Sequence, residues 1–362
     1  MIDKILLFPY WLTLKLRHFM YDHGMKKVHV ADVPTICVGN ITVGGTGKTP
    51  HTEMIVRLLS QDSFWGSKNI AVLSRGYKRK TKGFQQVVCE GSARQFGDEP
   101  LQIKRKFPSV TVAVDKSRKQ GCGFLSDPEQ VQTSKKARKC LHKDFPKADL
   151  IILDDAFQHR AVKPSVSIVL VDYNRPTFED HLMPLGKLRD LRERIGAADI
   201  VIVSKCPRFI DPWERSKWTE ALKIRKDQHI FFTTIGYDQS QAIFPEGDPR
   251  YLYTHKLILF SGIANDRPFR NYLTDSYKII RHFDFPDHHK FSKADIATIR
   301  RAADAFPTSV VMTTEKDCQR IRDCKSIPDN LKKRMFYAPI KVNFYSEMEQ
   351  EEFAATLNSY LK

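Results

Sequence analysis

The strongest constraint on the fold is a glycine-rich segment at residues 39–49, which reads GNITVGGTGKT. A short apolar run precedes it and a helical apolar pattern follows it, so we expect a strand, a loop and a helix N-terminus in succession. Glycines allow backbone N–H groups to surround phosphate oxygens at such a helix N-terminus. The segment therefore predicts a phosphate-binding loop (P-loop) that holds a nucleotide, and the alternative is a fortuitous glycine-rich turn.

Individual residues of this loop have expected roles. Lys48 can reach the β- and γ-phosphates, and the Thr49 hydroxyl can ligate Mg²⁺. The match is incomplete, because the strict pattern G-x-x-x-x-G-K-[ST] would place a glycine where Thr42 stands. The expected nucleotide-binding residues are Gly44, Gly45, Thr46, Gly47, Lys48 and Thr49.

Two adjacent carboxylates follow a later apolar run. Residues 150–153 read LIIL and are followed by Asp154 and Asp155. A P-loop enzyme holds its Mg²⁺ partly by a carboxylate at the end of such a strand. We therefore predict a metal role for Thr49 and for at least one of these two aspartates. The alternative is an aspartate pair that caps the next helix.

Short apolar runs alternate with helical patterns along the 362 residues, as expected of an α/β protein. Most runs are continuous, which is typical of parallel strands buried on both faces. We predict a mostly parallel, P-loop kinase-like sheet with helices on both faces, and a smaller C-terminal α/β domain. The expected divisions are an N-terminal helix at 1–26, an ATP-binding domain at 27–236 and a C-terminal domain at 237–362, with residues 237–249 as part of the junction. The predicted strands are 35–38, 70–74, 110–114, 150–153, 166–171, 200–204, 230–233, 257–260, 310–313 and 336–338, and the predicted closing helix is 347–361.

The charge and the N-terminus restrict the partners. Lysines and arginines number 59 and acidic residues 42, a net charge of +17, which favours an acidic partner: nucleic acid, anionic lipid or a phosphorylated substrate. The seven cysteines are scattered without a C-x-x-C pair, as in a reducing, cytoplasmic protein. Residues 5–21 combine aliphatic and aromatic bulk with basic residues, a pattern typical of a helix lying at a membrane surface. A helix docked on the protein's own core is the alternative.

Several motifs together resemble the tetraacyldisaccharide 4′-kinase (lipid A 4′-kinase) family. They occur in the family's order from about residue 34 to residue 317. The matching segments are the loop 38–50, SRGY at 74–77, GDEP at 97–100, DDAFQH at 154–159, PLGKLRD at 184–190, GIAN at 262–265, DH at 287–288 and TEKD at 314–317.

The resemblance implies a lipid kinase. Such an enzyme transfers the γ-phosphate of ATP, with Mg²⁺, to the 4′-hydroxyl of tetraacyldisaccharide 1-phosphate and forms lipid IVA in lipid A biosynthesis. The anionic lipid substrate implies a peripheral protein on the cytoplasmic face of the bacterial inner membrane, with the N-terminal helix on the membrane surface. We expect no nucleic-acid partner, because no aromatic-basic recognition motif or zinc ligand set is present.

The resemblance also implies site residues. Asp98 corresponds to the general base at the sugar hydroxyl, and His288 to the residue that orients it. Without the resemblance, Asp98 would be a turn residue and His288 an ordinary hydrogen-bonding histidine. Arg75 and Arg189 could bind substrate or nucleotide phosphate, and Asp190 could help to arrange phosphate and metal, although surface ion pairs are the alternative. The family usually has glutamate at Asp190, so the shorter side chain weakens the case for direct metal contact.

Two other enzyme classes share part of this pattern. A membrane-positioning ATPase of the deviant-Walker type would also combine a GGTGKT loop with an amphipathic segment, but its signature lysine would fall at Val43. A kinase for a soluble metabolite would share the nucleotide site without needing an apolar N-terminus. Acceptor preference separates that enzyme from a lipid kinase.

Overall fold

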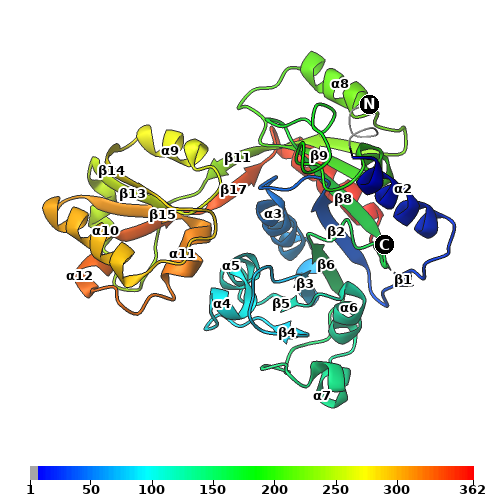
Figure 1. The fold of residues 1–362 in the computed structure, drawn as a ribbon, viewed down its shortest axis with the longest axis horizontal. Coiled ribbons are helices and arrows are strands. Elements are labelled where there is room, and N and C mark those ends of the chain that lie inside the picture. The colour runs from blue at the N-terminus through cyan, green and yellow to red at the C-terminus, as the bar shows by residue number, and fades with distance from the viewer. Residues whose placement is uncertain (1–6) are drawn as a thin grey trace.

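The structure is a computed structural model that describes residues 7–362. The predicted strands of the first series lie in one eight-stranded sheet of order β10-β9-β8-β2-β6-β3-β5-β4 (Figure 1). Every neighbouring pair in it is parallel except β4 and β5. The strands are β2 (Thr35–Asn40), β3 (Ile70–Ser74), β4 (Gln85–Gln86), β5 (Thr111–Val114), β6 (Leu150–Asp154), β8 (Val166–Asp172), β9 (Ile200–Ser204) and β10 (His229–Phe232).

Both faces of this sheet are covered by helices. In β2, Ile36 and Val38 belong to one apolar cluster and Cys37 to the other, because successive side chains point to opposite faces. The first cluster includes residues of α3 (Lys48–Gln61) and α5 (Asp98–Lys106), and the second includes residues of α6 (Arg118–Ser126) and α8 (Pro212–Ala221). Burial on both faces explains the continuous apolar runs, and the predicted α/β fold is confirmed. Short helices α4 (Ala93–Phe96) and α7 (Glu129–Thr133) lie between these elements.

A second, five-stranded sheet has the order β12-β16-β15-β13-β14. The sequence analysis did not predict β14, because its side chains are only half-buried and include Lys278, Arg281 and His282. An edge strand of this kind lacks the continuous apolar run of a central strand. Its strands are β12 (Gln241–Ala242), β13 (Lys256–Ser261), β14 (Lys278–Asp284), β15 (Val310–Thr314) and β16 (Met335–Ala338), and its helices are α9 (Arg267–Thr274), α10 (Lys293–Ala305), α11 (Glu315–Ile321) and α12 (Asp329–Lys332).

A two-stranded antiparallel ribbon connects the two sheets (Figure 1). It consists of β11 (Thr234–Tyr237) and β17 (Ile340–Asn343). The chain then returns to the first sheet, where Phe353 and Leu357 of the closing helix α13 (Glu347–Ser359) pack in the same cluster as Ile36. The division at 1–26, 27–236 and 237–362 remains a prediction. A further short pair, β1 (His29–Val30) and β7 (Val162–Lys163), is parallel.

The N-terminal helix α2 (Phe8–Asp22) has two different faces. Leu14 and His18 are buried against the protein, while the apolar side chains of Phe8, Leu12, Leu16 and Phe19 are exposed. The first six residues of the predicted 1–26 segment lie outside the described residues. Within residues 7–362, no helix has the length and apolar character needed to span a bilayer.

Candidate active site

The glycine-rich loop connects the carboxyl end of β2 to the first residue of α3. Gly47 precedes this helix with a φ of 86°, a left-handed conformation that glycine adopts without steric cost. The Asn40 side chain donates to the Thr46 hydroxyl over 2.8 Å and accepts from Lys48 Nζ over 3.4 Å. Lys48 is thus held at the loop, with its side chain 17% exposed. A glycine-rich turn that leads into a helix N-terminus beside a lysine is suited to binding phosphate.

Two buried polar side chains form hydrogen bonds with backbone carbonyls of the loop. The Ser204 hydroxyl donates to the Thr46 carbonyl over 2.9 Å. His51 contacts the Gly47 carbonyl through Nδ1 at 2.7 Å and the Thr233 hydroxyl through Nε2 at 2.9 Å. Burial lowers the pKa of His51 to about 4, so the ring is neutral, donates from Nδ1 and accepts at Nε2. Because Thr233 directly precedes β11, this contact connects the loop to the ribbon between the sheets.

The aspartate pair after β6 lies beside the loop, because Val38 and Asp154 are partners in the register of β2 and β6. Asp154 is buried, and its two oxygens accept from Thr52 and Ser74 over 3.2 and 3.0 Å. Burial, together with the charges of Glu99 and Asp155, raises the pKa of Asp154 to about 6. The two adjacent aspartates thus differ in burial and in hydrogen bonding.

Asp155 is the more accessible aspartate, with its side chain 33% exposed and its Oδ1 3.9 Å from Lys48 Nζ. It also forms a short ion pair with Arg189. Burial alone would raise the pKa of Asp155, but the charges of Lys48 and Arg189 outweigh it and hold the pKa below its ordinary value. Its φ of 46° is uncommon for a residue with a side chain. Such strained residues cluster at functional sites.

The two arginines expected to bind phosphate, Arg189 and Arg75, lie in different surroundings. Arg189 bridges Asp155 and the side-chain oxygen of Asn40, the latter at 2.7 Å, so it joins the loop and the aspartate pair. Arg75 follows the last residue of β3 and is exposed. Asp190 does not lie with Arg189 at the loop: its side chain is 1% exposed and faces His18 of α2. The sequence analysis expected Asp190 to help arrange phosphate and metal, whereas in the structure its carboxylate contacts His18.

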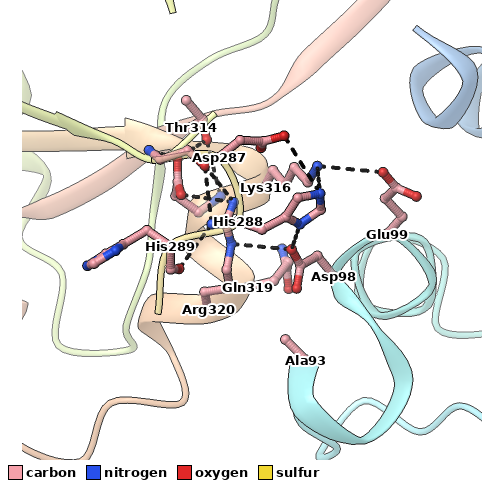
Figure 2. Close-up of polar contacts among 12 residues, drawn as sticks. Ala93, Asp98, Glu99, Asp287, His288, His289, Thr314, Lys316, Gln319 and Arg320 are labelled. Atoms are coloured by element: carbon pink, nitrogen blue, oxygen red, sulfur yellow. Dashed lines mark hydrogen bonds and ion pairs between the residues drawn. The ribbon is translucent and has the colours of Figure 1, made fainter. Parts of the chain in front are cut away.

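Asp98 and His288 meet between the two sheets, 190 residues apart in sequence (Figure 2). Asp98 begins α5, and His288 lies in the loop after β14 with a φ of 62°. Asp98 Oδ2 is 3.1 Å from His288 Nδ1, and the two side chains are 13% and 19% exposed. The structure therefore brings the second predicted pair together from two separate parts of the chain.

Two residues that the sequence analysis did not assign to the site complete this cluster (Figure 2). Lys316 and Arg320, one turn apart on α11, lie 3.3 Å from His288 Nε2 and 3.3 Å from Asp98 Oδ2, respectively. Because the Lys316 ammonium only donates, His288 Nε2 accepts and its Nδ1–H donates to Asp98. The TEKD segment was the available signal, and the four-residue spacing to Arg320 places both cations on one helix face.

These cations control the charge of Asp98. Burial alone would raise the pKa of the Asp98 carboxyl, but the hydrogen bond from His288 and the charges of Arg320 and Lys316 outweigh it and lower the pKa. The carboxylate is therefore ionised at neutral pH and able to accept a proton.

A Lys316→Met variant tests this control. Removing one positive charge should raise the pKa of Asp98, so the acidic limb of the kcat/KM profile should move to higher pH. The measurement is a pH–rate profile for product formation, with Lys325→Met, at an exposed lysine, as the control. A profile of Lys316→Met that superimposes on the wild-type profile would contradict the assignment.

The two clusters lie at one end of the first sheet. A Cβ on Gly97 would lie 3.2 Å from the Tyr77 carbonyl oxygen, so the turn before Asp98 packs against the SRGY loop after β3. The Glu99 carboxylate also acts on the pKa of Asp154. The Asp98 cluster and the glycine-rich loop therefore lie at the same end of the first sheet.

The side-chain oxygens in this region that could hold a metal ion belong to hydroxyls and carboxylates. Within residues 7–362, no group of three or more His, Cys, Asp or Glu side chains is arranged to hold a metal ion. Mg²⁺ at a P-loop needs no such group, since it takes a hydroxyl, one carboxylate, substrate phosphates and water. Thr49, at the start of α3, and Asp155 are the residues that could hold Mg²⁺ here.

Comparison with known proteins gives a consistent result over the whole chain. The family model described as tetraacyldisaccharide-1-P 4′-kinase matches residues 4–362. The tetraacyldisaccharide 4′-kinase of Phocaeicola vulgatus is 38% identical over 96% of this chain and 91% of its own length. The protein of the same name from Flavobacterium johnsoniae is 36% identical over 99% of this chain and 97% of its own. The crystal structure of the "apo" form of LpxK from Aquifex aeolicus in complex with ATP matches with a TM-score of 0.72 at 24% identity, and the match covers all of both chains.

Proposed function

This chain belongs to the tetraacyldisaccharide-1-P 4′-kinase family, and we propose that Asp98, His288 and Lys48 carry out the phosphoryl transfer of that family in it. It is an ATP-dependent phosphotransferase of lipid A biosynthesis. It transfers the γ-phosphate of ATP to the 4′-hydroxyl of tetraacyldisaccharide 1-phosphate and so forms lipid IVA. The observation that carries the residue assignment is the Asp98–His288 pair at the end of the sheet that bears the nucleotide loop.

Asp98 acts as the base at the acceptor hydroxyl. Within the described part of the chain, the contacts of Asp98 with His288 and Arg320 both use Oδ2, so we assign the substrate proton to Oδ1. As the sugar hydroxyl proton passes to Oδ1, its oxygen bonds to the γ-phosphorus, the bond from phosphorus to the bridging oxygen breaks, and ADP leaves. A carboxylate of low pKa is sufficient for this role. In a loose phosphoryl-transfer transition state, positioning of the hydroxyl matters more than its early deprotonation.

The P-loop holds the nucleotide in this assignment. The backbone of Gly44, Gly45, Thr46 and Gly47 surrounds the phosphates, and Lys48 neutralises charge on the β- and γ-phosphates. Arg189 adds a second positive charge beside Lys48, since both contact Asn40 and Asp155. Arg75, exposed after the end of β3, is assigned to a phosphate of the lipid substrate or of the nucleotide.

Thr49 and Asp155 fit the protein ligands of Mg²⁺. The oxygens of Asp154 are engaged by Thr52 and Ser74, so Asp154 contributes by fixing α3 and β3 around the site. Mg²⁺, when bound, neutralises charge on the β- and γ-phosphates. The chain's own residues orient the γ-phosphate and exclude water from it.

The experiment that tests this function is transfer of radiolabelled γ-phosphate from Mg-ATP to detergent-dispersed tetraacyldisaccharide 1-phosphate. Labelled lipid IVA is the expected product. Hydrolysis of ATP without labelled lipid, under conditions in which a known family member succeeds, would contradict the acceptor assignment.

We further propose that α2 places the enzyme on the membrane surface at the cytoplasmic face of the inner membrane. The exposed side chains of Phe8, Leu12, Leu16 and Phe19 follow helical spacing and define the outer face of α2. Lys15 and the net charge of +17 favour an anionic surface nearby. An apolar helix face beside basic groups is what interfacial binding requires.

A double variant of this outer face, Leu12→Ser with Leu16→Ser, should reduce partitioning to anionic vesicles. Burial of one such side chain contributes about 1.5 to 3 kcal/mol, so partial burial of two predicts a loss of about tenfold to a hundredfold in the partition coefficient. Vesicle co-sedimentation measures it, with Thr13→Ala on the same helix as the control, because the Thr13 hydroxyl donates to the Pro9 carbonyl of its own helix. Unchanged co-sedimentation of the folded double variant would contradict the proposal.

A further inference from the structure

The inner face of α2 makes a buried polar contact with the segment that carries Arg189. His18 Nε2 lies 2.6 Å from Asp190 Oδ1, and the two side chains are only 7% and 1% exposed. The residues are 172 positions apart in sequence. A buried carboxylate must have a hydrogen-bonding partner, and the N-terminal helix supplies it.

The neighbours of His18 determine which nitrogen carries the proton. Arg160 Nη1 lies 3.2 Å from His18 Nδ1, and the same atom donates to the His18 carbonyl over 3.1 Å. A guanidinium only donates, so Nδ1 of His18 accepts and its Nε2–H donates to Asp190. Asp190 Oδ1 also accepts from the backbone N–H of Leu191 over 2.8 Å, which fixes the carboxylate against its own backbone.

Two further contacts connect α2 to this region. The Tyr10 hydroxyl donates to the carbonyl of Arg189 over 3.2 Å. Arg17 donates to the carbonyl of Gln158, which lies three residues after Asp155. One helix face therefore contacts the backbone of both segments that carry the loop-facing groups.

These segments converge on the nucleotide loop. The Arg189 guanidinium donates to the Asn40 side chain over 2.7 Å and pairs with Asp155. The Gln158 side chain donates to the Asn40 carbonyl over 2.6 Å. Asn40 in turn accepts from Lys48. Polar contacts, joined by the peptide link between Asp190 and Arg189, therefore connect His18 to Lys48.

We propose that His18 is a positioning residue for phosphoryl transfer. It holds Asp190 so that the neighbouring Arg189 reaches Asp155 and Asn40 at the loop. The inference rests on the function proposed above. In this proposal α2 has a second role, which belongs to its inner face: the docked helix positions Arg189 for phosphoryl transfer. Transfer should therefore depend on α2 even when the lipid is presented in detergent micelles, where no membrane has to be bound.

The test compares His18→Ala and His18→Gln with wild type, as full chains in mixed micelles. The measurements are kcat, KM for the lipid, Kd for Mg-ATP, and co-sedimentation with anionic vesicles. A displacement of about 1 Å in a charge-stabilising group can lower a rate about a hundredfold, so we expect kcat of His18→Ala to fall about tenfold to a hundredfold. Co-sedimentation should stay within about twofold of wild type, because the outer face is intact. Glutamine retains an N–H donor and an acceptor, and should restore most of kcat.

A matched control is His23→Ala, just beyond the end of the same helix. His23 is exposed, and its described contacts are with Phe19 of α2, so kcat should remain at the wild-type value. Tyr10→Phe provides a second variant of the proposed connection, with a smaller expected loss of about twofold to fivefold, and it decides the question if His18→Ala does not fold.

Two results would overturn the inference. One is a kcat of folded His18→Ala within twofold of wild type. The other is a loss confined to vesicle binding or to lipid KM. If wild type itself forms no labelled lipid, the proposed function fails and this inference fails with it. If wild type and His18→Ala form product equally, only this inference fails.

Discussion

Replacement of Asp98 by alanine should lower kcat about 10²- to 10⁴-fold, the range that a general base contributes, while Kd for Mg-ATP changes no more than about twofold. The physical reason is the separation of the two clusters: Asp98 contacts His288 and Arg320, whereas the loop lysine contacts Asn40 and Asp155. The measurement pairs radiolabel transfer to the lipid with equilibrium binding of Mg-ATP. A loss in turnover without a loss in affinity is the signature of a group that acts only in the transition state.

Two companion variants sharpen this experiment. His288→Gln should lose less kcat than Asp98→Ala, because it removes the orienting group and leaves the carboxylate in place. Asp304→Asn, at an exposed carboxylate of α10, is the control and should retain wild-type turnover. If Asp98→Ala instead weakens Mg-ATP binding and leaves kcat intact, Asp98 belongs to the nucleotide site and the assignment as base is wrong.

The second large effect is expected at Lys48. Lys48→Met should lower kcat about 10²- to 10³-fold, the usual effect of removing one preorganised charge-stabilising group. It should also weaken Mg-ATP binding about tenfold. The cause is that Lys48 is the cation of the loop itself and lies 3.9 Å from Asp155, whereas Arg189 forms the closer ion pair with that carboxylate and is more fully neutralised.

The same two measurements apply to Lys48, with Lys68→Met, at an exposed lysine, as the charge-matched control. Together the two variants separate the roles: loss at Asp98 should appear in kcat alone, and loss at Lys48 in both constants. Retention of kcat in a folded Lys48→Met enzyme would contradict the assignment of Lys48 to the transferring phosphate.

Most of the first sheet was predictable because its inner strands are parallel. Each is covered on both faces, so its residues must be apolar without interruption, and the runs at 70–74 and 200–204 coincide with β3 and β9. The ribbon of β11 and β17 was not predictable in this way. Its two four-residue strands pair across about a hundred positions and carry no periodic signal of their own.

The closing helix shows the same limit. Its existence follows from the spacing of Phe353, Leu357 and Leu361, and the structure contains it. Its location does not follow from that spacing, because an apolar helix face specifies burial without specifying the partner surface. The helix packs on the first sheet although the second sheet is nearer to it in sequence.

The sequence by itself determined the family, the parallel sheet and the glycine-rich turn before a helix, because those features depend on contiguous segments in which composition and spacing carry the physics. Only the tertiary structure decided what each charged side chain faces. It separated Asp154, with both oxygens engaged, from the accessible Asp155, and it turned Asp190 toward His18. It also brought Arg320 of α11 to Asp98, and Lys316 of the same helix to His288. The reason is that burial and ion pairing depend on residues that are far apart in the sequence. A local sequence pattern does not encode which of them become neighbours in the fold.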